Sequence, residues 1–366
     1  MVSSLFLPGV DCATMEVLQT IELKREETEM QITSVGLDLA KNVFHVVCFD
    51  ARGHEVKKRM LRRGKVSAFF AQLPSCLIGM EACGGAHYWP RTLGELGHEV
   101  KLIPAQHVKA YLRGNKNDYN DAHAIAEALG RPSMRFVAVK SVQQQDVQAL
   151  HRIRAQCVKE RTALCNSTRG LLSEYGLVVA QGVSVLRRAI PELLEDAENG
   201  LSESFRALLA RRYQQLLELG EHITHYTEQL QHMAEQDDAC RRLRTLPGFG
   251  PIVASAFVST VGDGSAYRRG RDVSAAIGLV PAQHSSGGKE RLLGISKRGD
   301  RYLRTLLVHG ARSVVYQAQR KDDRLSRWLQ RLCTERGMNK AVVAMANKMA
   351  RMGWAVLSKG TVYQAA

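Results

Sequence analysis

The sequence predicts an α/β domain followed by a longer, mostly helical region, and three observations support this. Residues 31–142 alternate short apolar runs with segments of helical period. Residues 143–240 show helical periods alone, and residues 241–366 combine helical periods with a basic composition. Residues 1–30 carry two basic and six acidic residues and differ in composition from the rest of the chain. We therefore predict an N-terminal extension over 1–30, with a short charged helix at 17–30.

The segment 31–142 is expected to begin with strands. Apolar or alternating runs at 32–38, 44–49 and 55–61 predict three strands, the first two joined as a hairpin and the third more polar. The later elements are predicted as a helix at 66–73, a strand at 77–81, a helix at 88–96, a strand at 100–104 and a helix at 118–129. This order of elements is that of the ribonuclease H-like fold, which we predict here.

Four acidic residues stand out in this segment. Asp38 and Glu81 each end an apolar, strand-like run, where a carboxylate is costly unless it is paired or binds a cation. Asp118 and Asp121 are three apart and fall on one side of the first turn of a helix. Converging carboxylates could hold a divalent metal for phosphoryl transfer. Alternatively, Asp38 caps a turn and Asp118 caps a helix. Such capping could account for any one of these residues, but less well for all four together.

Charge indicates a polyanionic partner. The chain has 366 residues and a net charge of +15, and residues 241–366 carry 23 Lys and Arg against seven Asp and Glu. Nucleic acid is the usual partner of such a segment, and an anionic membrane surface is the alternative. No run of about 18 apolar residues is present to span a bilayer. The N-terminus also lacks the basic and apolar regions of a signal peptide, so a cytoplasmic, nucleoid-associated protein is expected.

Cysteine and histidine patterns offer no metal site. The eight cysteines are scattered without a CxxC pair, which argues against both a zinc ribbon and a disulfide framework. The 12 histidines show no HExxH motif, and we assign them no metal.

Residues 143–240 are predicted to form a helical or coiled-coil linker. Apolar residues recur at spacings of 3, 4, 3, 4 and 3 at Leu216, Leu219, Ile223, Tyr226, Leu230 and Met233. The run covers fewer than three heptads, so a packed helical hairpin within one protomer is as good an interpretation as an extended coil. A spacing or oligomerisation role follows from either.

Residues 246–250, Leu-Pro-Gly-Phe-Gly, lie between helical patterns and predict a helix–hairpin–helix element. The backbone around Gly248 and Gly250 would present N–H groups to a DNA phosphate at a helix N-terminus. An ordinary helix–helix turn is the alternative.

A second candidate nucleic-acid segment lies further along the chain. Ser285-Ser286-Gly287-Gly288 is expected to be an open loop with no strand or helix through it. The run 295–304 is expected to be a basic amphipathic helix lying on phosphates. The basic residues predicted to contact nucleic acid are Lys289, Arg291, Lys297, Arg298, Arg301 and Arg304, the last three on one helical face. The alternative is a plain linker.

Together these motifs resemble those of a known family. The motifs are 36–41 (Gly-Leu-Asp-Leu-Ala-Lys), 80–84 (Met-Glu-Ala-Cys-Gly), 115–122 (Asn-Lys-Asn-Asp-Tyr-Asn-Asp-Ala), 246–250, 278–281 (Gly-Leu-Val-Pro) and 285–289. In this order and at these separations, from about residue 34 to 358, the chain resembles transposases of the DEDD insertion-sequence class, which act as bridge-RNA-guided serine recombinases.

The resemblance implies a RuvC-like domain at 31–142, a coiled-coil linker at 143–240 and a C-terminal transposase domain at 241–366. It implies that Asp38, Glu81, Asp118 and Asp121 coordinate Mg²⁺ and that Ser286, next to Ser285, is the catalytic serine. It further implies a composite site built from two protomers, and donor and target DNA that pair with a non-coding RNA. Recombination of two duplexes suggests a dimer that pairs to a tetramer.

Two other functions remain open from the sequence. A metal-dependent nuclease of the Holliday-junction type would hydrolyse DNA with the acidic residues alone and form no covalent intermediate. The second is a non-enzymatic, basic scaffold that binds nucleic acid, in which the four acidic residues would have no function. A serine recombinase, by contrast, would store the phosphodiester energy in a phosphoserine bond.

Overall fold

The computed structural model describes residues 31–114 and 117–364. The predicted extension at 1–30, with its helix at 17–30, lies outside the described residues. The chain divides into two compact units, one ending at Val139 and the other beginning at Lys140. Each unit is described by itself.

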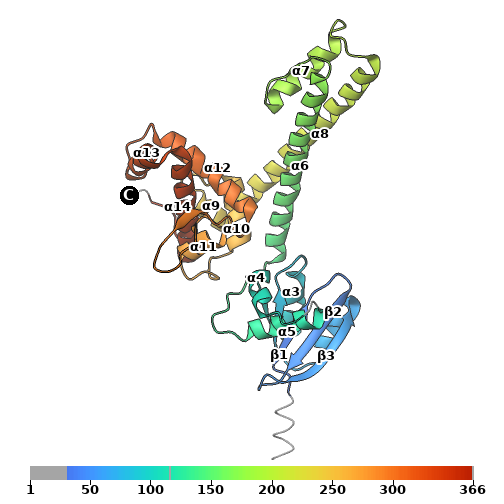
Figure 1. Ribbon diagram of the computed structural model, residues 1–366, viewed down its shortest axis with the longest axis vertical. Coiled ribbons are helices and arrows are strands. Elements are labelled where there is room, and N and C mark those ends of the chain that lie inside the picture. Colours follow the sequence, from blue (N-terminus) through green and yellow to red (C-terminus); the bar gives the residue numbers. More distant parts are fainter. Residues whose placement is uncertain (1–30, 115–116, 365–366) are drawn as a thin grey trace, which may run out of the picture. The chain divides into compact units, whose positions relative to one another are not determined.

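The first unit is built on a five-stranded sheet, part of which is labelled in Figure 1. The strands are β1 Ser34–Asp38, β2 Val43–Phe49, β3 Glu55–Arg62, β4 Leu77–Glu81 and β5 Glu99–Ile103, in the order β3-β2-β1-β4-β5. Strands β1, β2 and β3 are antiparallel neighbours, whereas β1, β4 and β5 are parallel. All five strands predicted from the sequence are confirmed.

Helices cover both faces of this sheet. The helical elements are η1 Arg63–Lys65, α2 Val66–Phe70, α3 Tyr88–Glu95, α4 Ala105–Val108, η2 Lys109–Tyr111 and α5 Asp118–Leu129. Val35 and Leu37 of β1 share a core with Phe70 of α2 and Leu93 of α3. Their neighbour Gly36 faces α5 instead, because side chains alternate along a strand. The helix predicted at 118–129 is therefore confirmed and lies on the face of the sheet opposite to α2 and α3.

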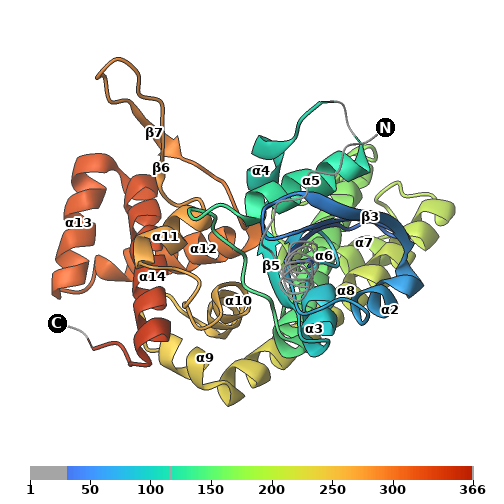
Figure 2. The ribbon, with the colours of Figure 1, turned by 90° about the horizontal axis from the view of Figure 1, so that it is seen from below.

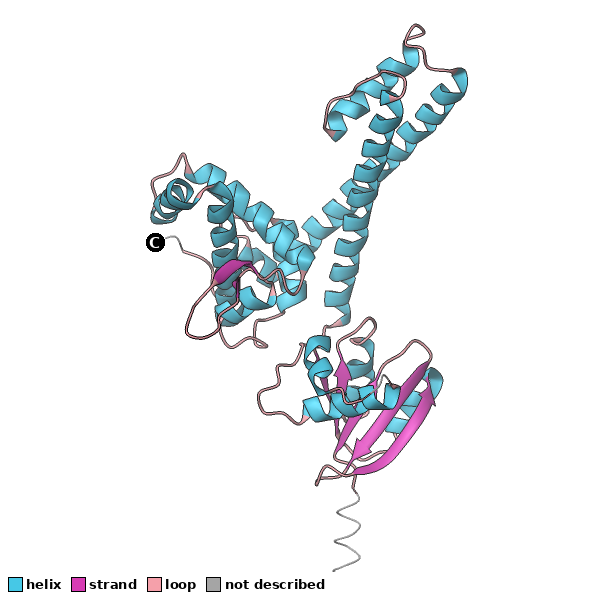
Figure 3. Ribbon diagram, in the orientation of Figure 1, coloured by secondary structure: helices cyan, strands magenta, loops and turns pink. Residues whose placement is uncertain are grey.

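The second unit begins with a helical hairpin. Its helices are α6 Val142–Ser173, α7 Val183–Glu195, α8 Glu203–Gln236 and α9 Asp238–Leu243, and α6 and α8 lie side by side (Figure 3). Leu216 packs in one core with Cys165 and Leu172 of α6. Ile223 and Leu230 of the predicted apolar seam are also buried. Within this chain the seam thus forms the packed helical hairpin that was one of its two interpretations.

The rest of the unit surrounds a buried C-terminal helix. Its elements are α10 Pro251–Val261, α11 Gly270–Ala276, β6 Pro281–Gln283, β7 Leu292–Ile295, α12 Arg301–Ala318, α13 Arg324–Arg336 and α14 Met338–Lys359. Met345 and Met349 of α14 are fully buried among α10 and α12, in a core that includes Phe249 and Phe257. Over the described residues, no helix is both long enough and apolar enough to cross a bilayer.

One expectation for this unit is confirmed and one was wrong. Residues 285–288 form a loop without strand or helix, as predicted, and this loop joins β6 and β7, which pair as an antiparallel hairpin. Arg298 was expected on a helix, but α12 begins only at Arg301 and residues 296–300 form a loop. Gly299 belongs in this loop, since a β-carbon there would lie 1.7 Å from the Ala276 carbonyl oxygen.

Candidate active-site residues

Three aspartates of the first unit converge on one point. One carboxylate oxygen from each of Asp38, Asp118 and Asp121 lies within 4.8 Å of the others. Asp38 is the last residue of β1, and the other two lie in the first turn of α5. Asn117 caps this helix, its side chain accepting a 2.9 Å hydrogen bond from the Tyr119 N–H. The predicted alternative that Asp118 is itself the cap is therefore wrong.

Two glycines bring the helix onto the strands. Gly36 lies two residues before Asp38 and therefore on the same face of the sheet. A β-carbon on Gly36 would lie only 2.0 Å from the Ala122 carbonyl oxygen of α5. Gly79 of β4 gives similar room, with the Ile125 side chain 3.1 Å from the position of its β-carbon. These small residues allow α5 to place its two aspartates beside Asp38.

Glu81 lies near this cluster but is not part of it. Because β4 is parallel to β1 and in register with it, Glu81 ends its strand beside Asp38. Among the described residues, only the three aspartates meet the 4.8 Å spacing. Burial and the charge of Asp121 raise the pKa of Glu81. Glu81 therefore interacts electrostatically with the cluster without meeting its close spacing.

The cluster is electrostatically strained. Burial, followed by repulsion from Asp121 and Asp118, raises the pKa of Asp38 to about 6, although the neighbouring His45 acts in the opposite direction. Like charges at this spacing oppose one another's ionisation unless a cation lies between them. Hard oxygen ligands of this kind suit Mg²⁺. The residues present therefore fit a divalent metal.

His45 was missed by the sequence analysis. It pairs with Asp38 across β1 and β2, and its ring packs edge-on against Tyr119 at 4.7 Å. Its Nδ1 atom lies 3.6 Å from Asp118 Oδ2 and, although buried, has no hydrogen-bond partner among the described residues. The available signal was the predicted hairpin, whose short turn places residue 45 opposite residue 38.

The predicted serine segment forms the tip of the β6–β7 hairpin (Figure 2). Gly287 and Gly288 have φ values of 57° and 75°, and the Lys289 N–H donates to the Ser286 carbonyl at 3.1 Å. Two consecutive residues with positive φ form a type I′ turn, which glycine adopts at little cost. The glycine pair thus has a structural role in closing the hairpin.

The two serines of this hairpin differ in their contacts. The Ser285 hydroxyl accepts hydrogen bonds from Gln283 Nε2 at 2.9 Å and from the Arg291 N–H at 3.3 Å. Ser286 is exposed, and its hydroxyl makes no hydrogen bond to any residue that the structure describes. Ser285 therefore supports the hairpin, whereas the Ser286 hydroxyl is accessible to a ligand.

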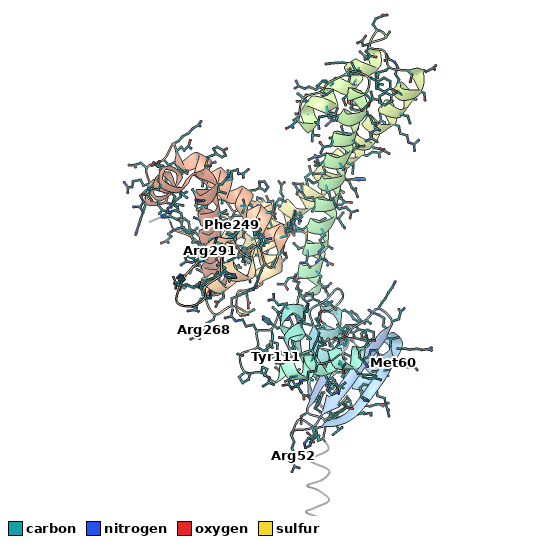
Figure 4. All side chains as sticks on the ribbon, in the orientation of Figure 1. Arg52, Met60, Tyr111, Phe249, Arg268 and Arg291 are labelled. Atoms are coloured by element: carbon teal, nitrogen blue, oxygen red, sulfur yellow. The ribbon has the colours of Figure 1, made fainter. Side chains whose placement is uncertain are left out.

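The basic residues near the hairpin fall into two groups. Lys289, Arg291 (labelled in Figure 4), Lys297, Arg298 and Arg301 are exposed. Arg304 instead donates from one terminal nitrogen to the carbonyl oxygens of Ile277 and Arg298, both at 2.7 Å. The expectation of one helical face carrying Arg298, Arg301 and Arg304 is corrected, because Arg298 lies in a loop and Arg304 holds that loop in place.

The Gly248–Gly250 turn lies between α9 and α10, as the sequence predicted. Gly248 has a φ of 84°, and a β-carbon there would lie 2.8 Å from Met349 and 3.0 Å from the Gly310 carbonyl oxygen. The close approach at Gly248 is therefore to α12 and α14 within the unit. Gly250 is exposed at the N-terminus of α10, with open space around its α-carbon.

Comparisons with known proteins agree on one group. A family model described as "Transposase IS116/IS110/IS902 family" matches residues 240–327, and a second, described as "Transposase", matches residues 35–177. A "Probable family 20 transposase" of Pseudomonas aeruginosa is 49% identical over 336 residues, covering 92% of this chain and 99% of the relative. The "Transposase for insertion sequence element IS1111A" of Coxiella burnetii is 46% identical over 341 residues, covering 93% and 94%. The "Transposase for insertion sequence element IS1328" of Yersinia enterocolitica is 40% identical, covering 91% and 98%.

Proposed function

Because the chain belongs to the IS110/IS116 family of insertion-sequence transposases, and so is a DNA-processing enzyme, we propose that it cleaves and rejoins DNA through the acidic cluster and Ser286. The observation that carries the proposal is the convergence of Asp38, Asp118 and Asp121 within 4.8 Å. The strand order β3-β2-β1-β4-β5 supports our assignment of a ribonuclease H-like, RuvC-like fold to the first unit.

Asp38, Asp118 and Asp121 would hold Mg²⁺, with Glu81 nearby as a further carboxylate. Bound Mg²⁺ would polarise a phosphoryl oxygen and lower the pKa of a coordinated hydroxyl or water. The protein contributes the fixed positions of the carboxylates, which the packing of α5 on β1 provides. Single Asp→Asn changes at the three positions should each abolish strand cleavage on a supercoiled substrate. Retained cleavage in an Asp118→Asn, Asp121→Asn double variant would overturn the assignment.

Ser286 is proposed as the nucleophile. Its Oγ would form a bond to the scissile phosphorus and lose its proton, while the bond from phosphorus to one sugar oxygen breaks and releases a sugar hydroxyl. Rejoining reverses these steps with a hydroxyl from another strand. Exposure of Ser286 supports this role, and the use of the Ser285 hydroxyl within the hairpin favours Ser286 over its neighbour. Lys289 and Arg291 would balance charge on the phosphoryl oxygens.

A metal-dependent nuclease without a covalent intermediate is the second candidate. It is favoured by the surroundings of Ser286, since the Ser286 hydroxyl makes no hydrogen bond to a described side chain that could take its proton. In such an enzyme the acidic cluster would activate water and the second unit would only bind DNA. The two functions differ in one product, because only the recombinase forms a covalent protein–DNA bond.

A guide RNA and an oligomer belong to the same proposal. With a guide RNA, base pairing would choose the donor and target DNA, so the protein would need no sequence-reading surface of its own. Sequencing the RNA that copurifies with the protein tests this, and an absence of one defined species would contradict it.

We also propose a dimer that pairs to a tetramer, with acidic residues and serine supplied by different protomers. Mixing Asp38→Asn and Ser286→Ala proteins should then restore some cleavage, whereas an inactive mixture would contradict shared sites.

A further inference from the structure

Two adjacent hollows in the second unit are not used by the proposed chemistry. One, of about 410 Å³, lies between α11 and α14, and the other, of about 840 Å³, lies between α13 and α14. Lys348 and Met352 of α14 line both hollows, so the two are neighbours, and we refer to them together as the groove. None of the described residues that line the groove belongs to the β6–β7 hairpin.

All the charged residues that line the groove are basic. Its basic residues are Arg269, Arg271, Arg324, Arg327, Arg331, Lys348 and Arg351, and no carboxylate of the described part of the chain lines it. Arg327, Arg331 and Arg269 make long contacts of 3.8, 3.9 and 4.0 Å to carboxylates outside the lining, and ion pairs of exposed arginine side chains are weak. Arg324 and Arg351 form no ion pair with any described residue. The unbalanced charge indicates a polyanionic ligand.

Three aromatic side chains are among the residues that line the groove. Trp328 and Tyr363 line the larger hollow, and Lys348 Nζ lies 4.9 Å from the centre of the Trp328 ring. Trp354 lines the smaller hollow, but its indole N–H already donates to the Gly264 carbonyl at 3.0 Å. Trp328 can offer the face of its ring to a ligand if Lys348 moves from that ring onto an anion.

This combination distinguishes between forms of nucleic acid. A duplex keeps its bases paired and stacked inside, so it offers phosphates to arginine side chains but no base face to an aromatic ring. A single strand offers both phosphates for arginine side chains and unstacked bases for an aromatic ring. We propose that the α11–α13–α14 groove binds single-stranded nucleic acid, with its phosphates on Arg324 and Arg351 and a base against Trp328. The proposal rests on the proposed function only in that both require a nucleic-acid partner.

The first test measures binding without cleavage. The affinity of full-length protein for a labelled 12-nucleotide single strand is measured by fluorescence anisotropy in EDTA at several salt concentrations. The Arg324→Ala, Arg351→Ala variant should bind at least tenfold more weakly, and its log–log salt slope should be smaller by roughly 1.4, about 0.7 for each phosphate contact. The matched control is Arg312→Ala, Arg320→Ala, which removes the same charge from exposed positions outside the groove. The proposal would be overturned if the two variants lost affinity equally. It would also be overturned if the Arg324→Ala, Arg351→Ala variant lost more affinity for a duplex than for the single strand.

The second test isolates the base contact. An abasic strand with the same number of phosphates should bind wild-type protein about tenfold more weakly than the normal strand, because it cannot stack on an aromatic ring. That difference should disappear in Trp328→Ala and largely return in Trp328→Phe. Thermal unfolding of both variants shows whether they fold. If a folded Trp328→Ala protein still prefers the normal strand tenfold, Trp328 is not the stacking residue.

Discussion

Gly36 and Ala122 approach so closely that a β-carbon on residue 36 would lie 2.0 Å from the carbonyl oxygen of residue 122. This contact sets the distance between β1 and α5, and therefore the distance between Asp38 and the two aspartates of α5. The glycine of the Gly-Leu-Asp motif is thus a structural requirement of the acidic cluster.

Gly36→Ala should accordingly separate α5 from β1. The added carbon cannot be accommodated without moving backbone, so we expect a decrease of at least about 2 kcal/mol in the free energy of unfolding. Strand cleavage should fall with it. Gly64→Ala is the matched control, because a β-carbon there meets no described atom within 4 Å. Chemical denaturation of both variants measures the difference, and similar stabilities would show that the close approach is not needed.

Neutralising the cluster should stabilise the metal-free protein. Burial, Asp121 and Asp118 raise the pKa of Asp38 from 3.8 to about 6, so the folded state binds more protons than the unfolded state between these values. Stability in EDTA should therefore fall as the pH rises through that window. Asp38→Asn should flatten this dependence and raise the melting temperature at pH 7.5 by a few degrees. A lower melting temperature for Asp38→Asn would contradict the strained cluster.

His151 should make the second unit sensitive to acid. Its Nδ1 and Nε2 atoms lie 3.0 Å from the Tyr302 and Ser255 hydroxyls, which ties α6 to α12 and α10. Burial, with a smaller contribution from Arg154, lowers the pKa of His151 to about 4, although Asp300 opposes the shift. The free energy of unfolding should be highest above pH 6.5 and should decrease by about 3 kcal/mol in all as the pH falls to 4. This acid decline should be absent in His151→Gln and unchanged in a His309→Gln control at an exposed position. Equal declines in wild type and His151→Gln would contradict the assignment.

Exposed cations near the hairpin should control the salt dependence of duplex binding. Removing Lys289, Arg291 and Arg301 together should reduce the log–log salt slope by roughly 0.9 for each phosphate that the variant no longer neutralises. Arg304→Ala should instead lower the melting temperature, because it releases the Ile277 and Arg298 carbonyls. If the triple variant and wild type show the same slope, these residues do not contact phosphates.

Patterns of burial explain what could be predicted from the sequence. Strands β1, β2, β4 and β5 and helix α5 have buried apolar positions such as Val35, Leu37 and Ile125, and those positions give the sequence a clear period. The β6–β7 hairpin does not, since Leu292 and Leu293 of β7 are 64% and 49% exposed and its pairing depends on the glycine turn.

Residues whose roles depend on distant contacts were harder to assign. Gly248 is part of a Gly-x-Gly motif, but its close neighbours Gly310 and Met349 come from α12 and α14. Arg304 shows helical spacing, yet its partners are backbone carbonyls, which no pattern of side chains reveals. His45 could be found only from the register of β1 and β2.

The most direct test of the account is a search for a covalent intermediate. Protein, copurified RNA and end-labelled DNA are incubated with Mg²⁺ and separated on a denaturing gel. We predict a protein–DNA adduct for wild type that is absent in Ser286→Ala and present in Ser296→Ala. Ser285→Ala should retain it with reduced yield, because the variant cannot form the hydrogen bonds to Gln283 and Arg291. Efficient cleavage by wild type without any adduct, or an adduct that persists in Ser286→Ala, would contradict the account and favour hydrolysis or another nucleophile.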